Sequence, residues 1–160
     1  MARIYLASSW RNADQPRTLA LLRGAGHEVY DFRNPFHAAR GFAWSDLDAD
    51  WLNWSAEAYR RAILTHPIAS HGYTNDMRAM QWADTCVLLL PSGRSAHLEA
   101  GWFCGRGKRC IIRTFDGEEP ELMALMATEI VVSDAELLDA IDGSPIISTR
   151  LKPVASASNG

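Results

Sequence analysis

A short, uninterrupted apolar run near the middle of the chain constrains the fold more than any other feature. Residues 86–90 (Cys-Val-Leu-Leu-Leu) are apolar throughout, which is typical of a strand covered on both faces of a sheet. Pro91 and a small polar loop then interrupt the run. Ser95 is a good N-cap residue, so we expect a helix to begin at Ala96. A buried strand, a polar loop and a helix in this order predict an open α/β sheet, in which ligands bind at the carboxyl ends of the strands.

Strand and helix patterns alternate along most of the chain. Strands are expected at residues 3–7, 28–32, 86–90, 110–115 and 130–132, and helices at residues 14–23, 96 onwards, 119–126 and 134–141. Ser133 and Glu136 form a capping box for the last helix. The alternation implies a parallel sheet with right-handed crossovers. We therefore expect a single flavodoxin-like or Rossmann-like α/β domain, doubly wound, with about five parallel strands in the order 2-1-3-4-5.

Residues 33–72 interrupt the alternation of strands and helices and are interpreted as an inserted loop and helix. Five apolar residues of the insert fall on one helical face, a pattern more typical of a core stripe than of a ligand cage: Leu47, Trp51, Trp54, Ala58 and Ala62. The loop before them offers stacking faces and hydrogen-bond donors, and we expect base specificity to reside there: Phe36, His37, Arg40, Phe42 and Trp44. The main domain then covers residues 1–142, and residues 143–160 form a C-terminal tail.

Two acids are the candidate catalytic residues. Glu99 follows the polar loop, so we expect it in the first turn of a helix at the carboxyl end of a strand. A helix N-terminus favours the ionised form of a nearby acid by ~0.3–1 kcal/mol. A capping-box role would need an acid three residues after Ser95, and that position is Leu98. Asp76 is expected to open the preceding helix after a cap at Thr74 or Asn75, so a structural role competes there.

The composition limits the classes of function that this chain can have. The 160 residues suit one domain, and a net charge of −3 gives no sign of a nucleic-acid-binding face. No apolar run approaches the length that spans a membrane, and Met1 to Arg3 run directly into a strand, so we expect neither a membrane segment nor a signal peptide. The three cysteines lie in apolar segments and are interpreted as reduced core residues of a cytoplasmic protein.

No metal site or organic cofactor is expected. His66 and His71 are separated by four residues, but Pro67 follows the first and no cysteine lies nearby.

Four groups of residues, in the right order, resemble the nucleoside 2-deoxyribosyltransferase family and its nucleoside-monophosphate N-glycosidase relatives. They are residues 4–10 (Ile-Tyr-Leu-Ala-Ser-Ser-Trp), 73–76 (Tyr-Thr-Asn-Asp), 83–84 (Ala-Asp), and 99–101 (Glu-Ala-Gly) followed by 107–108 (Gly-Lys). No single group is specific, but together they span most of residues 3–114.

The resemblance implies roles for individual residues. Glu99 occupies the place of the glutamate that attacks the anomeric carbon and forms a glycosyl-enzyme, which water or a second base resolves. Asp76 matches the acid that contacts the sugar and helps to position the nucleophile. Trp10 occupies the place of an aromatic residue that packs on the base. Three further residues of the matched groups are expected to bind substrate: Tyr5, Ser8 and Asn75.

The loop before Glu99 departs from the transferases, which carry a base-handling aspartate there. This chain has Ser92, Gly93, Arg94 and Ser95, with no acid. The composition is closer to the phosphate-binding loop of the monophosphate glycosidases, although the loop is one residue longer. The resemblance therefore implies a 5′-phosphate site built from these four residues.

The implied partner is a small-molecule nucleoside or nucleotide. Members of the family are oligomers with active sites near subunit interfaces, so we also expect a homodimer or higher homo-oligomer, with the tail resting on a neighbouring subunit. Two other functions stay open at this stage: a non-catalytic nucleotide sensor, and an NAD glycohydrolase of the TIR-like kind.

Overall fold

The computed structural model describes residues 1–36, 38 and 40–143. Its core is one five-stranded sheet in which every neighbouring pair of strands is parallel. The strands are β1 (Arg3–Ala7), β2 (Glu28–Tyr30), β3 (Thr85–Leu89), β4 (Arg109–Arg113) and β5 (Glu129–Val131). Their order is β2-β1-β3-β4-β5, which confirms the predicted topology. The predicted tail contact and His37 lie outside the described residues.

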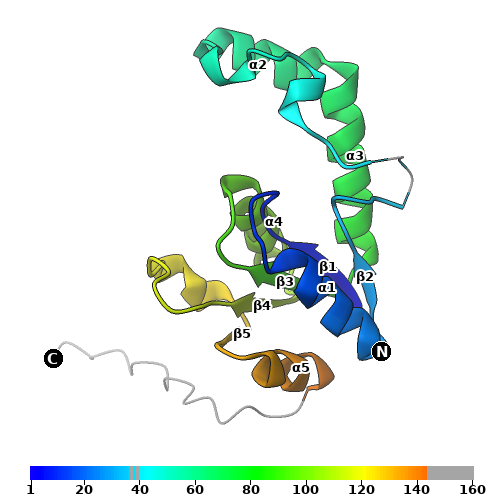
Figure 1. Cartoon of the computed structure of the whole chain (residues 1–160), viewed down its shortest axis with the longest axis vertical. Coiled ribbons are helices and arrows are strands. Elements are labelled where there is room, and N and C mark those ends of the chain that lie inside the picture. Colours follow the sequence, from blue (N-terminus) through cyan, green and yellow to red (C-terminus); the bar gives the residue numbers. More distant parts are fainter. Residues whose placement is uncertain (37, 39, 144–160) are drawn as a thin grey trace, which may run out of the picture.

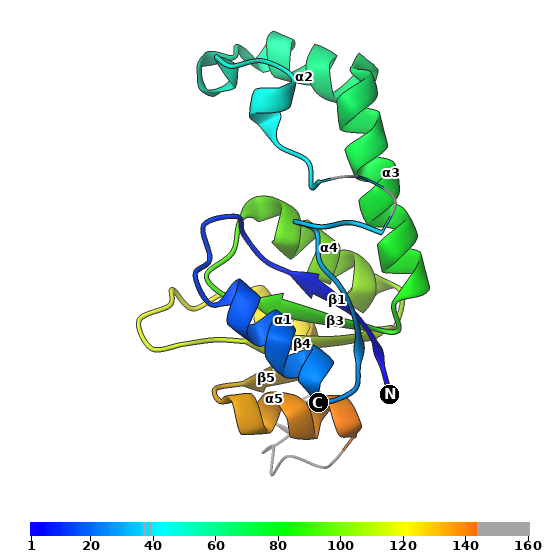
Figure 2. The ribbon, with the colours of Figure 1, turned by 45° about the vertical axis from the view of Figure 1, so that its right-hand side comes forward.

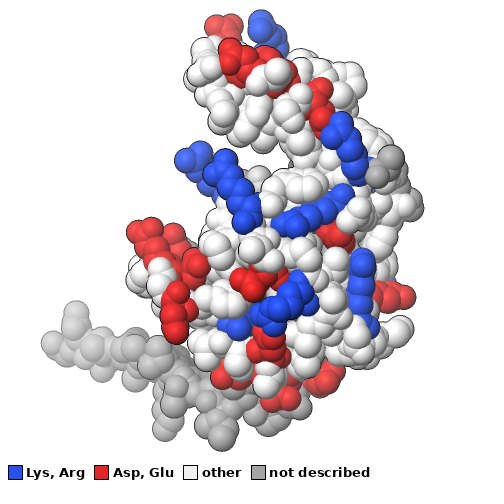
Figure 3. All heavy atoms as spheres, in the orientation of Figure 1, with Lys and Arg blue, Asp and Glu red and all other residues white. Residues whose placement is uncertain are grey.

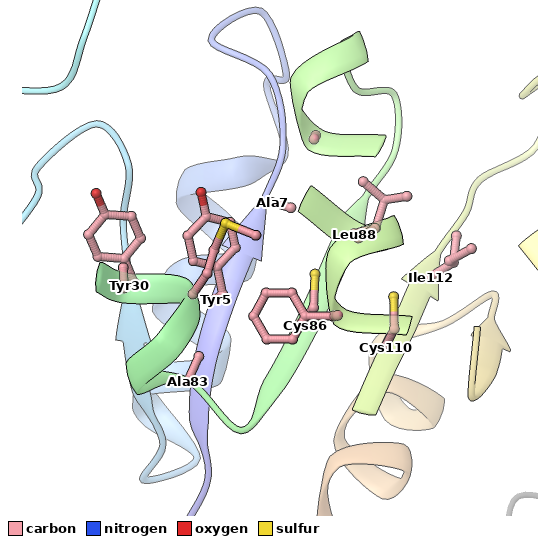
Figure 4. Close-up of a cluster of buried hydrophobic side chains, with 13 residues drawn as sticks. Tyr5, Ala7, Tyr30, Ala83, Cys86, Leu88, Cys110 and Ile112 are labelled. Carbon is pink, nitrogen blue, oxygen red and sulfur yellow. The ribbon is translucent and has the colours of Figure 1, made fainter. Parts of the chain in front are cut away.

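The helices are α1 (Gln15–Gly24), α2 (Ala56–Thr65), α3 (Pro67–Trp82), α4 (Arg94–Gly105) and α5 (Asp134–Asp142). All but α2 pack on the sheet, with α1 and α5 on one face and α3 and α4 on the other (Figures 1 and 2). Alternate residues of β1 show how the two layers form: Ile4 and Leu6 pack with α1 and α5, whereas Tyr5 and Ala7 pack with α3 and α4. Figure 4 shows this second cluster beneath α4. Burial on both faces explains why β3 is apolar from Cys86 to Leu89.

The insert differs from its prediction. In place of one helix from Leu47 onwards, two 3-10 turns (Trp44–Asp46 and Trp51–Asn53) precede α2. The predicted core stripe is only half-buried, and no residue of α2 is buried. The physical reason is visible in Figures 1 and 2, where α2 and the first turns of α3 extend beyond the sheet as an arm. The stripe packs within the arm rather than on the main core.

Three helix boundaries also differ from prediction. The helix α3 begins at Pro67, where His66 caps it by accepting a hydrogen bond from the Ile68 backbone N–H, so Asp76 lies in mid-helix and does not open the helix. The helix α4 begins at Arg94 with Gly93 as its N-cap, so Ser95 is not the cap. Residues 122–126 form a 3-10 helix rather than an α-helix. The cap of α5 at Ser133 is confirmed, with its hydroxyl 3.2 Å from the Glu136 nitrogen.

Candidate active site

Two tyrosines on neighbouring strands form the floor of the site. Tyr5 and Tyr30 are paired in the register of β1 and β2, and their rings stack with centroids 5.3 Å apart. Figure 4 shows the two rings side by side, with their hydroxyl groups at the same end. Both side chains are buried. The hydroxyls are therefore presented together at one edge of the sheet, beneath α3 and α4.

Each tyrosine meets one of the two candidate acids. The Tyr30 hydroxyl donates a 2.8 Å hydrogen bond to Oδ1 of Asp76. Tyr5 lies beside Glu99, and its hydroxyl lowers the pKa of that acid. Asp76 reaches the site from α3 and Glu99 reaches it from α4, so two helices and two strands converge on one small group of side chains. The structure thus brings together three of the residues predicted from sequence: Tyr5, Asp76 and Glu99.

The electrostatics of Glu99 differ from the prediction. Glu99 is the sixth residue of α4 and lies in its second turn, beyond the strongest influence of the helix N-terminus. The pKa of Glu99 is raised to about 7: burial raises it most, the negative charge of Asp76 raises it in the same direction, and the Tyr5 hydroxyl lowers it. The expected stabilisation of the ionised form by the helix dipole is therefore outweighed by desolvation.

Asp76 is the more acidic member of the pair. Burial raises the pKa of Asp76, and the hydrogen bond from Tyr30 lowers it. Because the charge of Asp76 contributes to the raised pKa of Glu99, Asp76 ionises first. Two adjacent carboxyl groups whose environments separate their pKa values are a common arrangement in acid–base and nucleophilic catalysis.

A cavity of about 220 Å³ adjoins Asp76 on the side of the insert. Aromatic rings supply part of its wall, and polar side chains of α3 supply another part: Tyr30, Phe32, Phe42, His71, Asn75 and Asp76. The remaining lining residues are Pro35, Ala38, Arg40, Gly41, Asp46, Ile68 and Gly72. Two residues of the predicted base-specificity loop, Arg40 and Phe42, thus border a cavity next to a candidate catalytic acid.

Gly41 and Gly72 allow the residues of this wall to pack closely against each other. A Cβ atom on Gly41 would lie 2.1 Å from the Phe32 carbonyl oxygen and 2.8 Å from the Trp10 ring. A Cβ atom on Gly72 would lie 2.9 Å from the Phe42 ring. The loop can therefore approach both Phe32 and α3 only because these two positions lack side chains.

Trp10 lies against the outside of this loop. Its indole N–H donates to the Phe42 carbonyl oxygen at 3.2 Å, and its ring meets Phe32 edge-on at 5.4 Å. Arg33 covers the Trp10 ring and also donates to three backbone oxygens of the loop after β1, those of Ser9, Trp10 and Asn12. Trp10 is still 51% exposed. It therefore braces the cavity wall and keeps a free face beside the site.

The loop between β3 and α4 is held by a residue that the sequence did not single out. Asn12 is buried, and its side-chain nitrogen donates to the backbone oxygens of Leu89 and Pro91. The Leu90–Pro91 peptide bond is cis. Ser92 is half-buried, whereas Gly93, Arg94 and Ser95 are exposed. No side chain caps the first turn of α4, so its leading N–H groups have no acceptor from a cap.

Other matched residues have structural roles. The Ser8 hydroxyl donates to the Leu89 carbonyl oxygen at 3.1 Å and ties the end of β1 to β3. The Lys108 ammonium group lies 3.0 Å from the carbonyl oxygens of Met80 and Gln81 at the C-terminal end of α3, a favourable place for a cation. Within the described ranges, no group of three or more His, Cys, Asp or Glu side chains is arranged to hold a metal ion.

The described helices include none with the length and apolar character needed to cross a membrane. No family model matches the sequence, and no curated protein is similar enough to it to count as a relative. Comparison with solved structures is more informative.

A 2-deoxyribosyltransferase from Bacillus psychrosaccharolyticus matches with a TM-score of 0.59 and 20% identity, over 86% of this chain and 91% of that chain. The chain has its fold. The CMP N-glycosidase BcmB from Clostridium botulinum matches with a TM-score of 0.50 and 17% identity, over 88% of this chain and 98% of that one. A conserved protein from Enterococcus faecalis V583 matches with a TM-score of 0.51 and 16% identity, over 91% and 99% of the two chains.

Four residues of the site were missed by sequence reasoning. Tyr30, Arg33, Asn12 and His71 each bond to a predicted site residue or to a loop that carries one. Two of them had a usable signal: Tyr30 occupies a strand that lies next to β1 in the predicted order, and His71 lies one helical turn before Asn75. Asn12 and Arg33 act through long-range contacts that no spacing in the sequence reveals.

Proposed function

We propose that this protein cleaves or transfers the N-glycosidic bond of a nucleoside or nucleoside 5′-monophosphate, with Glu99 as the nucleophile, and that it belongs to the nucleoside 2-deoxyribosyltransferase-like family. One observation carries the proposal: Glu99 is paired with Asp76 above two stacked tyrosines at the sheet edge. The matched sequence groups and the shared fold support the family assignment.

The geometry suits a double displacement at C1′ of the sugar. Departure of the base leaves positive charge on the sugar ring, and a carboxylate beside C1′ stabilises that charge and then bonds to the carbon. Ionised Glu99 forms the ester, and the electron pair of the broken C–N bond leaves with the base. Attack by water, or by an incoming base, breaks the ester and regenerates the carboxylate. Asp76 remains ionised beside Glu99 and accepts hydrogen bonds from sugar hydroxyl groups.

A 5′-phosphate on the substrate would suit the first turn of α4. Free N–H groups and the positive end of the helix dipole attract anions. Ser92 and Ser95 add hydroxyl donors, and Arg94 adds a guanidinium group that can form paired, charge-assisted hydrogen bonds. Figure 3 shows Lys and Arg side chains along the lower edge of the hollow between the arm and the sheet. These features support a nucleoside monophosphate as the preferred substrate.

A base-release assay tests the proposal. Purified protein is incubated with a panel of nucleosides, nucleoside monophosphates and NAD, with and without a free acceptor base, and products are separated by chromatography. We expect release or exchange of a base from at least one nucleoside or monophosphate, and loss of that activity in Glu99→Gln. Binding of these compounds without any turnover would instead indicate a nucleotide sensor. Turnover of NAD alone would indicate an NAD glycohydrolase.

A further inference from the structure

The side chain of Asn75 has one satisfied end and one unsatisfied end. Asn75 is 7% exposed and borders the cavity beside Asp76. Its amide nitrogen lies 3.2 Å from Nε2 of His71, one turn earlier on α3. Its amide oxygen is buried and has no hydrogen-bond partner among the described residues. Leaving a buried acceptor unpaired costs about 1–3 kcal/mol, so this oxygen is poised to accept a hydrogen bond from a ligand.

His71 fixes which end of the amide is free. When the His71 proton is on Nδ1, Nε2 accepts a hydrogen bond from the Asn75 NH₂ group, and the oxygen is the end that remains. The oxygen is covered by protein atoms in this state, so a turn of the amide towards the cavity is part of ligand binding. A ligand group that pairs with this oxygen must therefore be a hydrogen-bond donor, an N–H or an O–H.

The cavity itself suits a flat ring. Tyr30, Phe32 and Phe42 contribute aromatic surface to the cavity. Gly41 and Gly72 are required because a side chain at either position would collide with Phe32 or Phe42. Aromatic faces favour stacked or edge-to-face contacts with planar heterocycles. The cavity also borders Asp76, so a ring bound there would be attached to a sugar held beside the two catalytic acids.

We infer that Asn75 selects the base of the substrate, and that the cavity takes a base with an exocyclic amino group, whose N–H is donated to the Asn75 amide oxygen. The inference rests on the proposed function and deepens it, because it names the class of base. An oxo group at the same ring position would face the amide oxygen with a second acceptor and would be disfavoured. Sites built around a buried polar group discriminate strongly against ligands that leave that group unpaired.

The test compares pairs of bases in which one member carries an exocyclic amino group where the other carries an oxo group. The values of kcat/KM are measured for the matched pairs cytidine and uridine, and adenosine and inosine, each as nucleoside and as 5′-monophosphate. We expect the amino member of at least one pair to be preferred by roughly tenfold or more. In Asn75→Leu this preference falls to about twofold or less, because the acceptor is absent. Ser70→Ala, an exposed change on the same helix, keeps the preference.

Two further measurements distinguish a failure of the proposed function from a failure of the proposed role of Asn75. Gly72→Ala pushes a methyl group against Phe42, so it raises KM for all members of the panel without changing the amino-to-oxo ratio. Binding of the same monophosphates to Glu99→Gln, measured by calorimetry, reports selectivity even without turnover. Absence of turnover throughout the panel would contradict the proposed function alone. An oxo preference, or an amino preference that persists in folded Asn75→Leu, would overturn the role of Asn75.

Discussion

The Tyr30 hydroxyl donates a 2.8 Å hydrogen bond to Oδ1 of Asp76. The Tyr30 ring stacks on Tyr5, whose hydroxyl lowers the pKa of Glu99. One aromatic pair on neighbouring strands therefore acts on both acids of the proposed site, and each effect can be removed by a change of tyrosine to phenylalanine that keeps the ring.

Tyr30→Phe should lower kcat by roughly tenfold or more while the fold persists, because Asp76 loses the donor that positions it. The pKa of Asp76 should rise, since a hydrogen bond that favours its ionised form is gone. Steady-state kinetics and thermal unfolding check this. Tyr59→Phe, at a tyrosine that is 50% exposed, is the control and should leave kcat unchanged. A normal rate in Tyr30→Phe would show that Asp76 is positioned by other contacts.

The pH dependence of stability should report the raised pKa of Glu99. Its pKa rises from an ordinary value of 4.5 to about 7 in the folded protein, so folding favours the protonated form. The stability that Glu99 contributes is present below pH 4.5 and is lost as pH rises through 7. Glu99→Gln should therefore match the wild type at pH 4 and be more stable at pH 8 by about 3 kcal/mol. Urea unfolding at the two pH values measures the difference, and a constant difference would contradict it.

Asp76→Asn should move the acid limb of the rate profile to lower pH. The negative charge of Asp76 raises the pKa of Glu99, so its removal lets Glu99 ionise earlier. Tyr5→Phe should move the same limb to higher pH, because the Tyr5 hydroxyl lowers the pKa of Glu99. The measurement is kcat/KM from pH 5 to pH 9 for both variants. Shifts in the same direction would mean that Glu99 is not the group that titrates.

Arg94→Ala should reduce kcat/KM for a nucleoside 5′-monophosphate by roughly tenfold and leave the value for the parent nucleoside within about twofold. The reason is that, in the proposed phosphate site, the exposed guanidinium group at the first turn of α4 would contact the phosphate and no other part of the substrate. Arg60→Ala, on exposed α2, is the control and should change neither value. Equal values for nucleoside and monophosphate in the wild type would count against a phosphate site.

The sheet was predictable because its signals are local and strong. The apolar character of β1 and β3 follows from burial on two faces, and the alternation of strands and helices indicates a parallel sheet with right-handed crossovers. The arm was not predictable, because an apolar stripe cannot reveal whether it packs on the main core or within a projecting segment. The same stripe predicted one helix where the chain forms two 3-10 turns and α2.

The candidate site was predictable in its acids and less so in their surroundings. Asp76 and Glu99 were identified by sequence, but the first-turn positions assigned to them were wrong, since the caps lie at His66 and Gly93. Desolvation by neighbouring elements sets the pKa of Glu99, and no local pattern reports it. The roles of the site residues, the phosphate loop, the oligomeric state and the cytoplasmic location stay predictions.

The most direct measurement is single-turnover base release by Glu99→Gln. An amide in place of the carboxylate keeps the size of the side chain but cannot attack C1′. With the best substrate of the panel, we expect release at least 10³-fold slower than in the wild type, with ligand binding retained. Glu57→Gln, at an exposed glutamate of α2, should release base at the wild-type rate. Near-normal release by Glu99→Gln would contradict the assignment of Glu99 as the nucleophile.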